Sequence, residues 1–327
     1  MANLSRRGVL AAGLGLGLAG FLPRPARAAP VAQAMAPGFE AVVAPDARLD
    51  TLHSDGRWCE GPCWVLRLGG LVFSDTRMNR MSLLREGAAA QAYRDPSNNA
   101  NGNCLDAEGR LVTCEHRTRR VVREREDGSI EVLADAFEGR RLNAPNDCAL
   151  GPDGAIWFTD PVFGIRQPDE GLMAEPEQAM RRVYRIAPSG RVEARIEDMD
   201  QPNGLAFAPD GQTLYVADAG AGLNPEGPRE IRAYRVTPEG AAEAGRIFAR
   251  LESGVPDGLE TDADGRLYAA CEDGVRVFAP DGTLLGRIAT PTTPANIVFG
   301  GVDGRRLFIT AGKAVHAVNM RAQGRGF

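Results

Sequence analysis

The stretch Asn146-Asp-Cys-Ala-Leu-Gly-Pro-Asp-Gly154-Ala-Ile-Trp-Phe-Thr-Asp160 contains the unit that decides the fold. An asparagine stands eight residues ahead of a turn glycine, and an apolar strand begins at that glycine. The same offset recurs at four other places, with Asn or Asp in the leading position: Asn101 with Gly109, Asn203 with Gly211, Asp257 with Gly265, and Asn296 with Gly304. A fixed offset places each oxygen-bearing side chain at the same point of a repeated structural unit.

A sixth, looser copy begins at Glu60, which precedes Gly70 by ten residues. The six turn glycines are separated by 39, 45, 57, 54 and 39 residues, which is the length range of a four-stranded propeller blade. Asp-Gly dipeptides between the apolar runs are typical of tight hairpins, because both residues tolerate positive φ. No long segment after the N-terminus has a helical apolar period. We therefore predict an all-β fold, a six-bladed β-propeller with a central metal-binding channel.

The first 28 residues are predicted to be a twin-arginine signal peptide rather than part of the fold. Ser5-Arg6-Arg7-Gly8-Val9-Leu10 opens an apolar stretch that ends at Leu22, and Ala26-Arg27-Ala28 is a small-residue cleavage site. That stretch is shorter than the ~20 residues that a membrane-spanning helix needs. We expect export to a periplasm, no membrane association after cleavage, and one domain over residues 29–327.

Charge and composition limit the kinds of molecule that we expect this protein to bind. The net charge is −5, and the one basic run, Arg117–Arg125, has the alternation of a solvated strand, so nucleic acid is not an expected partner. A monomer is the default, since the aromatic content is low. Six cysteines are compatible with disulfides or with buried thiols, and their spacing selects no pairing. Segments 164–180 and 220–229 are predicted to be loop insertions on one face, over the site.

Several catalytic motifs are missing, including Gly-x-Ser-x-Gly and His-Glu-x-x-His, and the chain holds only three histidines. What remains is a set of oxygen donors: Glu60, Asn146, Asn203 and Asp257. Two carboxylates with amide carbonyls suit a hard divalent cation, with Ca²⁺ favoured and Mg²⁺, Mn²⁺ or Zn²⁺ left open. The alternative is that these Asn and Asp residues only cap turns. The acids at Glu60 and Asp257 favour the cation, because a turn cap gives no reason for them.

Several motifs together resemble those of the gluconolactonase, senescence marker protein and luciferin-regenerating enzyme family. They are Glu60-Gly-Pro-Cys-Trp64, Leu142-Asn-Ala-Pro-Asn-Asp147, Trp157-Phe-Thr-Asp-Pro161, Gln201-Pro-Asn-Gly-Leu-Ala-Phe207 and Val255-Pro-Asp-Gly-Leu259. The resemblance implies a six-bladed propeller with one catalytic divalent cation in its channel. By motif, the metal ligands fall on Glu60, Asn146, Asn203 and Asp257.

One position departs from the animal sugar lactonases of that family. They have an Arg two residues ahead of the channel Asn, whereas this chain has Ala144. Another side chain would have to make the substrate contact that this Arg makes, and polar residues near the predicted channel are the candidates. We consider Asn101, Asn103, Glu115, His116 and Asn296 as substrate-binding residues.

The predicted function is metal-dependent hydrolysis of a sugar lactone. The cation would polarise the lactone carbonyl, and Asp257 would take a proton from the attacking water. Two alternatives stay open. The same donor set suits a phosphotriester or aryl ester hydrolase of the diisopropylfluorophosphatase type, and propellers also serve as non-catalytic periplasmic binding modules.

Overall fold

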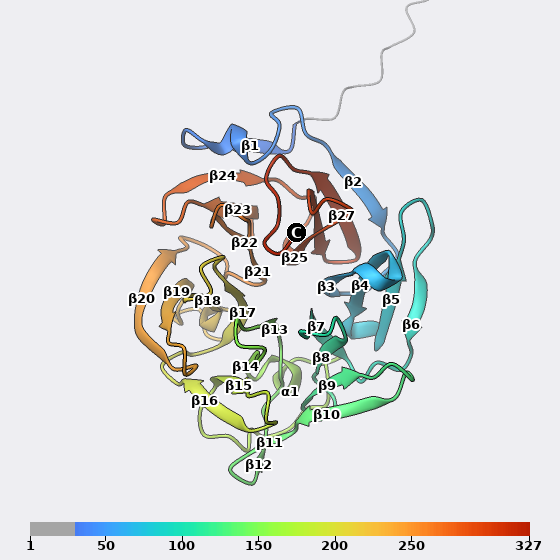
Figure 1. Ribbon diagram of the computed structural model, residues 1–327, viewed down its shortest axis with the longest axis vertical. Coiled ribbons are helices and arrows are strands. Elements are labelled where there is room, and N and C mark those ends of the chain that lie inside the picture. The colour runs from blue at the N-terminus through green and yellow to red at the C-terminus, as the bar shows by residue number, and fades with distance from the viewer. Residues whose placement is uncertain (1–29) are drawn as a thin grey trace, which may run out of the picture.

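The computed structural model describes residues 30–327, so the signal peptide predicted for residues 1–28 lies outside the described residues. Six antiparallel sheets surround a central axis, as the predicted six-bladed propeller requires (Figure 1). The inner strands of neighbouring blades contact one another around the whole ring. These inner strands, in blade order, are β3 (Cys59–Val65), β7 (Ala100–Leu105), β13 (Cys148–Leu150), β17 (Pro202–Phe207), β21 (Leu259–Thr261) and β25 (Pro294–Gly300).

Each blade continues outward through three further strands. In blades one to three these are β4 (Gly70–Asp75), β5 (Arg80–Leu84), β6 (Gln91–Arg94), β8 (Leu111–Glu115), β9 (Arg120–Glu124), β10 (Ile130–Ala134), β14 (Ile156–Asp160), β15 (Arg182–Ile186) and β16 (Val192–Ile196). In blades four to six they are β18 (Thr213–Asp218), β19 (Glu230–Val236), β20 (Ala242–Arg250), β22 (Leu267–Cys271), β23 (Gly274–Phe278), β24 (Leu284–Ile288), β26 (Arg306–Ala311), β27 (Ala314–Asn319) and β2 (Leu49–His53).

The ring is closed by the N-terminal part of the chain. Strand β2 is the outer strand of blade six, where Leu49 pairs with Val318 of β27. Strand β1 (Ala32–Ala34) adds a fifth strand to blade five, where Ala32 pairs with Ile288. Closure therefore joins the N-terminal part of the described chain to its C-terminal strands by backbone hydrogen bonds within blade six.

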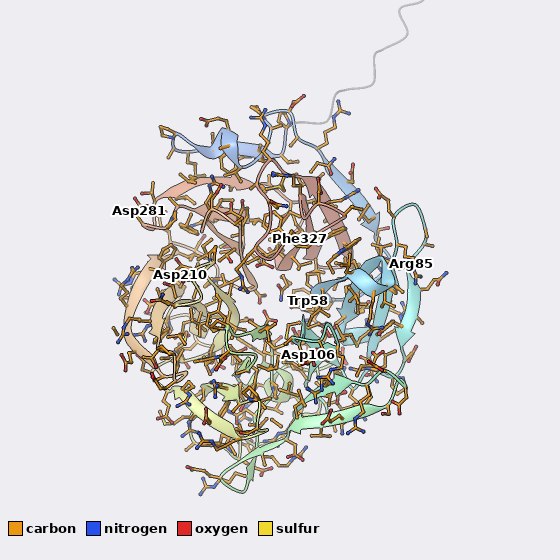
Figure 2. The ribbon with its side chains drawn as sticks, in the orientation of Figure 1. Trp58, Arg85, Asp106, Asp210, Asp281 and Phe327 are labelled. Carbon is orange, nitrogen blue, oxygen red and sulfur yellow. The ribbon has the colours of Figure 1, made fainter. Side chains whose placement is uncertain are left out.

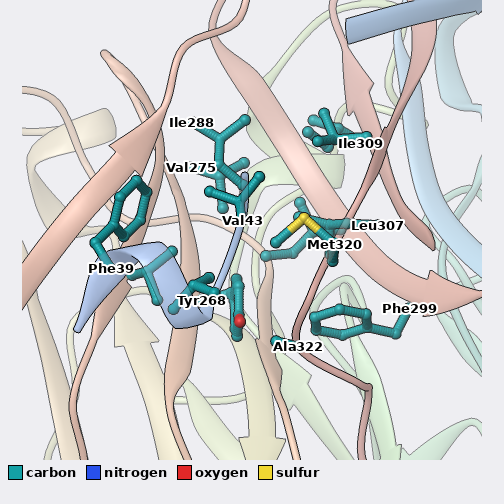
Figure 3. Close-up of a cluster of buried hydrophobic side chains, with 14 of the residues drawn as sticks. Phe39, Val43, Tyr268, Val275, Ile288, Phe299, Leu307, Ile309, Met320 and Ala322 are labelled. Carbon is teal, nitrogen blue, oxygen red and sulfur yellow. The ribbon is translucent and has the colours of Figure 1, made fainter. Parts of the chain in front are cut away.

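Apolar side chains fill the space between neighbouring blades. Figure 3 shows the cluster formed by blades five and six with the N-terminal segment, in which Phe39, Tyr268 and Phe299 are fully buried. The 3-10 turn Phe39–Ala41 presents Phe39 to this cluster. Burying a side chain of this size contributes roughly 1.5–3 kcal/mol, so the N-terminal segment is held by its apolar contacts as well as by its strands.

The turn glycines behave as predicted in five blades. Gly109, Gly154, Gly211, Gly265 and Gly304 all have φ between 65° and 82°, the left-handed region that favours glycine. The sixth copy corrects the sequence prediction by one residue. In blade one the left-handed glycine is Gly69, with φ 56°, because it ends the 3-10 turn Leu66–Leu68, and β4 then begins at Gly70.

Helical structure in the described range is limited to one short α-helix, α1 (Phe163–Arg166), and four 3-10 turns. These turns are Phe39–Ala41, Leu66–Leu68, Thr76–Met78 and Gly220–Gly222. A small hairpin of β11 (Ala136–Phe137) and β12 (Arg140–Arg141) precedes blade three. Within residues 30–327, none of the helices has the length and apolar character needed to cross a membrane.

Candidate active site

Three aspartates at the ends of second strands hold the loops that lead into the channel. Asp75, Asp160 and Asp218 close β4, β14 and β18, and each carboxylate accepts hydrogen bonds from two consecutive backbone N–H groups. The donors are Arg57 and Trp58 at 2.8 and 3.0 Å, Asn143 and Ala144 at 2.8 and 2.8 Å, and Asp200 and Gln201 at 2.9 and 2.9 Å. A predicted ligand follows two residues after each second donor. Charge-assisted bonds of this kind fix the backbone just ahead of Glu60, Asn146 and Asn203.

Close contacts between inner strands require glycine directly after most of these positions. A Cβ at Gly61 would collide with the backbone of Asn101, and one at Gly204 would collide with the backbone of Asp257. Glycine at these positions lets neighbouring inner strands approach closely and brings the side chains that precede it toward one space. Blades three and six are the exceptions, because Asp147 follows Asn146 and Ile297 follows Asn296.

Five of the six repeated polar side chains line one small cavity of about 130 Å³ in the channel, which we call the front pocket. These five are Glu60, Asn101, Asn146, Asn203 and Asp257. The remaining lining residues are Trp58, Phe163, Gln167, Glu170, Gly222 and Val255. Gln167, Glu170 and Gly222 come from the two predicted insertions, which therefore do cover the site, and Phe163 lies one residue ahead of the first insertion.

The front pocket concentrates negative charge without a basic side chain in its lining. Burial raises the pKa of Glu60 well above its usual range, and the nearby charges of Asp257, Glu170 and Asp147 add to the increase. Burial likewise raises the pKa of Asp257, with further increases from Asp147 and Glu170, while a hydrogen bond from Asn203 lowers it. Two buried acids repel each other when both are ionised, and a divalent cation between them would remove that cost.

The donor set of the front pocket fits a hard divalent cation. Within residues 30–327, no three His, Cys, Asp or Glu side chains are grouped closely enough to hold a metal by themselves. A metal here would therefore need the amide oxygens of Asn146 and Asn203 together with the two acids. Carboxylate and amide oxygens in an irregular cage are the ligands that Ca²⁺ accepts in proteins. The residues named from the sequence could hold such an ion.

A tryptophan and an arginine that the sequence prediction missed support Glu60. The Trp58 indole Nε1 donates to Glu60 Oε1 at 3.2 Å, and the Arg77 guanidinium lies 4.6 Å from the centre of the Trp58 ring. Arg77 in turn bonds Glu170 at 2.8 Å. The Trp58 contact orients one ligand, and the Arg77 contacts link it to the loop of residues 161–181.

Glu170 was also missed, because it lies in an insertion that has no counterpart in the other blades. It is 5% exposed and lines the front pocket. Burial raises its pKa, while the adjacent Arg77 lowers it. The only sequence signal for this residue was the prediction that segment 164–180 covers the site.

The substitution at Ala144 has a structural explanation. Ala144 is fully buried and packs against Val162 and Ile165, in a small apolar cluster that fixes the 161–181 loop. A long basic side chain at this position would displace the loop. The loop thus occupies the region above Ala144 and supplies Glu170 to the front pocket.

Of the five candidate substrate-binding residues, only Asn101 lines the front pocket. The Asn103 amide donates to the Gly61 carbonyl oxygen at 2.8 Å and accepts from the Thr113 hydroxyl at 2.7 Å, so its side chain ties blades one and two together. Glu115 is buried in an ion-pair network with Arg120 at 2.7 Å and Arg94 at 3.4 Å. Neither side chain is free to contact a ligand in the front pocket.

His116 lies beneath the 161–181 loop rather than in the pocket lining. It is fully buried, and its Nδ1 lies 3.0 Å from the backbone oxygen of Glu170. Burial lowers its pKa to about 4, so the imidazole is neutral at physiological pH. The structure therefore places His116 in a supporting position under Glu170.

Asn296 does not line the front pocket, because its side chain takes part in a hydrogen bond that crosses the channel. Its amide donates to the Asp147 carboxylate at 3.2 Å, and these residues come from blades six and three, on opposite sides of the ring. Beyond this bond lies a second cavity of about 620 Å³, the rear cavity, whose lining includes Asn103, Asp147, Glu260, Asn296 and, near the C-terminus, Gln323, Arg325, Gly326 and Phe327. Figure 2 shows Trp58, from the front pocket, and Phe327, from the rear cavity, both toward the centre of the ring.

Fold and pocket together define a six-bladed β-propeller that gathers polar side chains from several blades in its channel. The chain belongs to the SMP-30/Gluconolactonase/LRE-like family, whose profile matches residues 58–313. A gluconolactonase from Zymomonas mobilis is 29% identical over 311 residues, covering 88% of this chain and 85% of that protein.

Solved structures agree with this assignment. A gluconolactonase structure from Xanthomonas campestris is 40% identical with a TM-score of 0.82, covering 89% of this chain and 95% of that one. The structure of a calcium-binding regucalcin from Agrobacterium tumefaciens shares the fold at 18% identity, with a TM-score of 0.69 over 85% of this chain and 96% of that one.

Proposed function

We propose that this protein is a divalent-cation-dependent lactonase that hydrolyses a sugar lactone in the front pocket. The observation that carries the proposal is the meeting of Glu60, Asn146, Asn203 and Asp257, from four different blades, in one cavity. Its similarity to gluconolactonases from two bacteria supports the substrate class. Export by the twin-arginine route is part of the proposal and rests on residues 1–28 of the sequence.

We assign two roles to the residues of the front pocket, cation binding and general-base catalysis. A cation held by Glu60, Asn146, Asn203 and Asp257 would supply electrophilic stabilisation of the oxygen that becomes negative when the lactone carbonyl is attacked, with Ca²⁺ as the favoured ion. Glu60 accepts hydrogen bonds from Trp58 Nε1 at 3.2 Å and from the Gly61 N–H at 3.4 Å, so it is the better fixed of the two acids. Asp257 keeps a carboxylate oxygen for proton transfer and acts as the general base toward the attacking water.

The proposal is tested by assaying D-glucono-1,5-lactone before and after chelation. Metal content is measured in parallel, and Ca²⁺, Mg²⁺, Mn²⁺ and Zn²⁺ are then added back in turn. We expect hydrolysis to fall to the spontaneous rate on removal of the metal and to return with Ca²⁺. Full activity in protein shown to be free of metal would contradict the cation role.

An aryl ester and a fluorophosphate in the same panel test the reaction class. We expect the sugar lactone to be hydrolysed with the highest kcat/KM. Preference for the fluorophosphate would instead favour a phosphotriesterase, and no turnover of any substrate with any metal would favour a binding propeller.

A further inference from the structure

The loop of residues 161–181, between β14 and β15, is fixed against the propeller at several points. Its apolar residues Val162 and Ile165 pack on Ala144, and Gly164 lies directly against the His116 ring, where a Cβ would collide with the imidazole. Asn99 Nδ2 donates to the Asp169 backbone oxygen at 3.2 Å. These contacts hold the backbone of Glu170 in one place, so its side chain is a constant part of the front pocket.

Arg77 bonds the Glu170 carboxylate at only one of its two oxygens, Oε1. Arg77 donates to Oε1 from Nε at 3.2 Å and from Nη2 at 2.8 Å. The NH₂ group of Gln167, when turned toward the carboxylate, lies 3.0 Å from Oε1 and 3.3 Å from Oε2. A carboxylate oxygen can accept two hydrogen bonds, so Oε2 keeps acceptor capacity beside the front pocket.

The rest of the pocket lining leaves few partners for a hydroxylated ligand. Phe163, Gly222 and Val255 offer no polar side chain. The Trp58 indole donates to Glu60 and the Gln167 amide faces Glu170, so Asn101 is the other polar side chain of the lining. The side chains of Glu60, Asn146, Asn203 and Asp257 are those that would hold the cation. Glu170 is therefore the acidic side chain of the lining that remains for the sugar ring.

We infer that Glu170 is a specificity-determining residue, whose carboxylate accepts a hydrogen bond from a ring hydroxyl of the lactone and selects polyhydroxylated lactones over unsubstituted ones. The inference rests on the proposed function, since it concerns the same pocket. A site built to bond a hydroxyl discriminates strongly against the analogue that lacks it, because a buried polar group is then left unpaired.

The test compares two lactones on Glu170→Gln. Gln keeps the size of the side chain but replaces a charge-assisted hydrogen bond by a neutral one. We expect kcat/KM for D-glucono-1,5-lactone to fall roughly 10- to 100-fold, as for the loss of a bond to a charged group, and hydrolysis of δ-valerolactone to stay within about threefold. Equal losses on both lactones, or no loss on either, would overturn the inference.

Glu175→Gln is the matched control. Glu175 lies in the same loop and pairs with Arg166 at 2.7 Å, but its side chain is 84% exposed and lines no part of the pocket. This variant should keep the wild-type preference between the two lactones. If Glu170→Gln loses its cooperative thermal transition, Glu170→Asp replaces it, because Asp keeps the charge while withdrawing the carboxylate by one methylene.

A binding measurement separates this inference from the lactonase proposal. The unreactive ring 1,5-anhydro-D-glucitol carries hydroxyls but no carbonyl, and its affinity for the metal-loaded protein can be measured by calorimetry. We expect Glu170→Gln to weaken that affinity about tenfold and Glu175→Gln to leave it unchanged. Unchanged affinity in Glu170→Gln would overturn the inference even in an active lactonase. Weakened affinity would support it even if wild-type protein hydrolysed no lactone.

Discussion

The front pocket and the rear cavity are the two ends of one channel, built from the same inner strands, yet they differ in size and in chemistry. The front pocket has a volume of about 130 Å³ and is lined by five repeated oxygen donors. The rear cavity has a volume of about 620 Å³ and is lined mainly by apolar side chains and by the cysteines Cys63, Cys104 and Cys148, with Asp147, Glu260 and Arg325 among its charged residues. The end at which we propose the reaction is therefore the smaller of the two spaces.

The difference follows from how each lining is charged. In the front pocket, acids from different blades are buried close together, and each raises the pKa of Glu60 or Asp257. In the rear cavity, burial raises the pKa of Asp147 to about 7 and also raises the pKa of Glu260, but each acid has a hydrogen-bond donor within the protein. Asn296 donates to Asp147 at 3.2 Å, and the Thr261 N–H donates to Glu260 at 2.8 Å. All six cysteines are free thiols in the structure. Buried carboxylates without a positively charged partner are unfavourable unless a cation binds, and such groups indicate a functional site better than cavity volume does.

The strongest test of this comparison replaces one acid at each end of the channel. Asp257 and Glu260 lie three residues apart, in the front pocket and the rear cavity respectively. We expect Asp257→Asn to lower lactone turnover roughly 100- to 10,000-fold, the range for loss of a general base, while Glu260→Gln changes turnover by less than about threefold.

Circular dichroism should show that both variants keep the β-rich fold, so that a change in kcat can be assigned to chemistry. Near-normal turnover in Asp257→Asn would remove that residue from the catalytic role. An equal loss in Glu260→Gln would show that the rear cavity takes part in the reaction.

A second prediction concerns the loop over the front pocket and its pH dependence. His116 has a pKa of about 4 in the folded protein, below its ordinary value of about 6.5, because the ring is buried under the loop. The unfolded chain therefore binds a proton first as the pH falls from about 6.5 to 4. The free energy of unfolding should decrease over that window by up to about 3 kcal/mol.

Urea unfolding at several pH values measures this effect. We expect His116→Gln to have a flatter pH profile than the wild type between pH 6.5 and 4. Parallel profiles for wild type and His116→Gln would show that His116 does not control acid stability.

The smallest expected effect is at the rear end. Phe327 is half-exposed and packs against Gly304 beside the rear cavity. Deleting Phe327 removes only part of a phenylalanine's burial, so we expect a loss of about 1 kcal/mol in the free energy of unfolding and unchanged lactone kcat. Thermal unfolding and the lactone assay check the two halves of this prediction. A large fall in kcat would contradict the division of the channel into a reactive and an unreactive end.

The repeat predicted the fold and most of the front pocket, but one of its six positions was placed wrongly. Asn101, Asn146 and Asn203 lie where a common offset requires, because each precedes the same turn in an equivalent blade. Asn296 has the same offset, yet it bonds Asp147 across the axis at 3.2 Å and lines the rear cavity. The position after the repeated polar residue is glycine in four blades. Ile297 and Asp147 break that pattern in blades six and three, and the Asp147 side chain bonds Asn296 of the opposite blade.

The sequence by itself determined what a local repeat can encode: six equivalent blades, left-handed glycines at their turns, and an oxygen-bearing side chain ahead of each inner strand. These features depend on residues a fixed distance apart along the chain, so their spacing reveals them. Only the tertiary structure decided which side chains face the front pocket, that the 161–181 loop packs on Ala144, and that Glu170 joins the site. Those outcomes depend on contacts between residues far apart in the chain, where the packing of one blade or loop against another has no periodic signature.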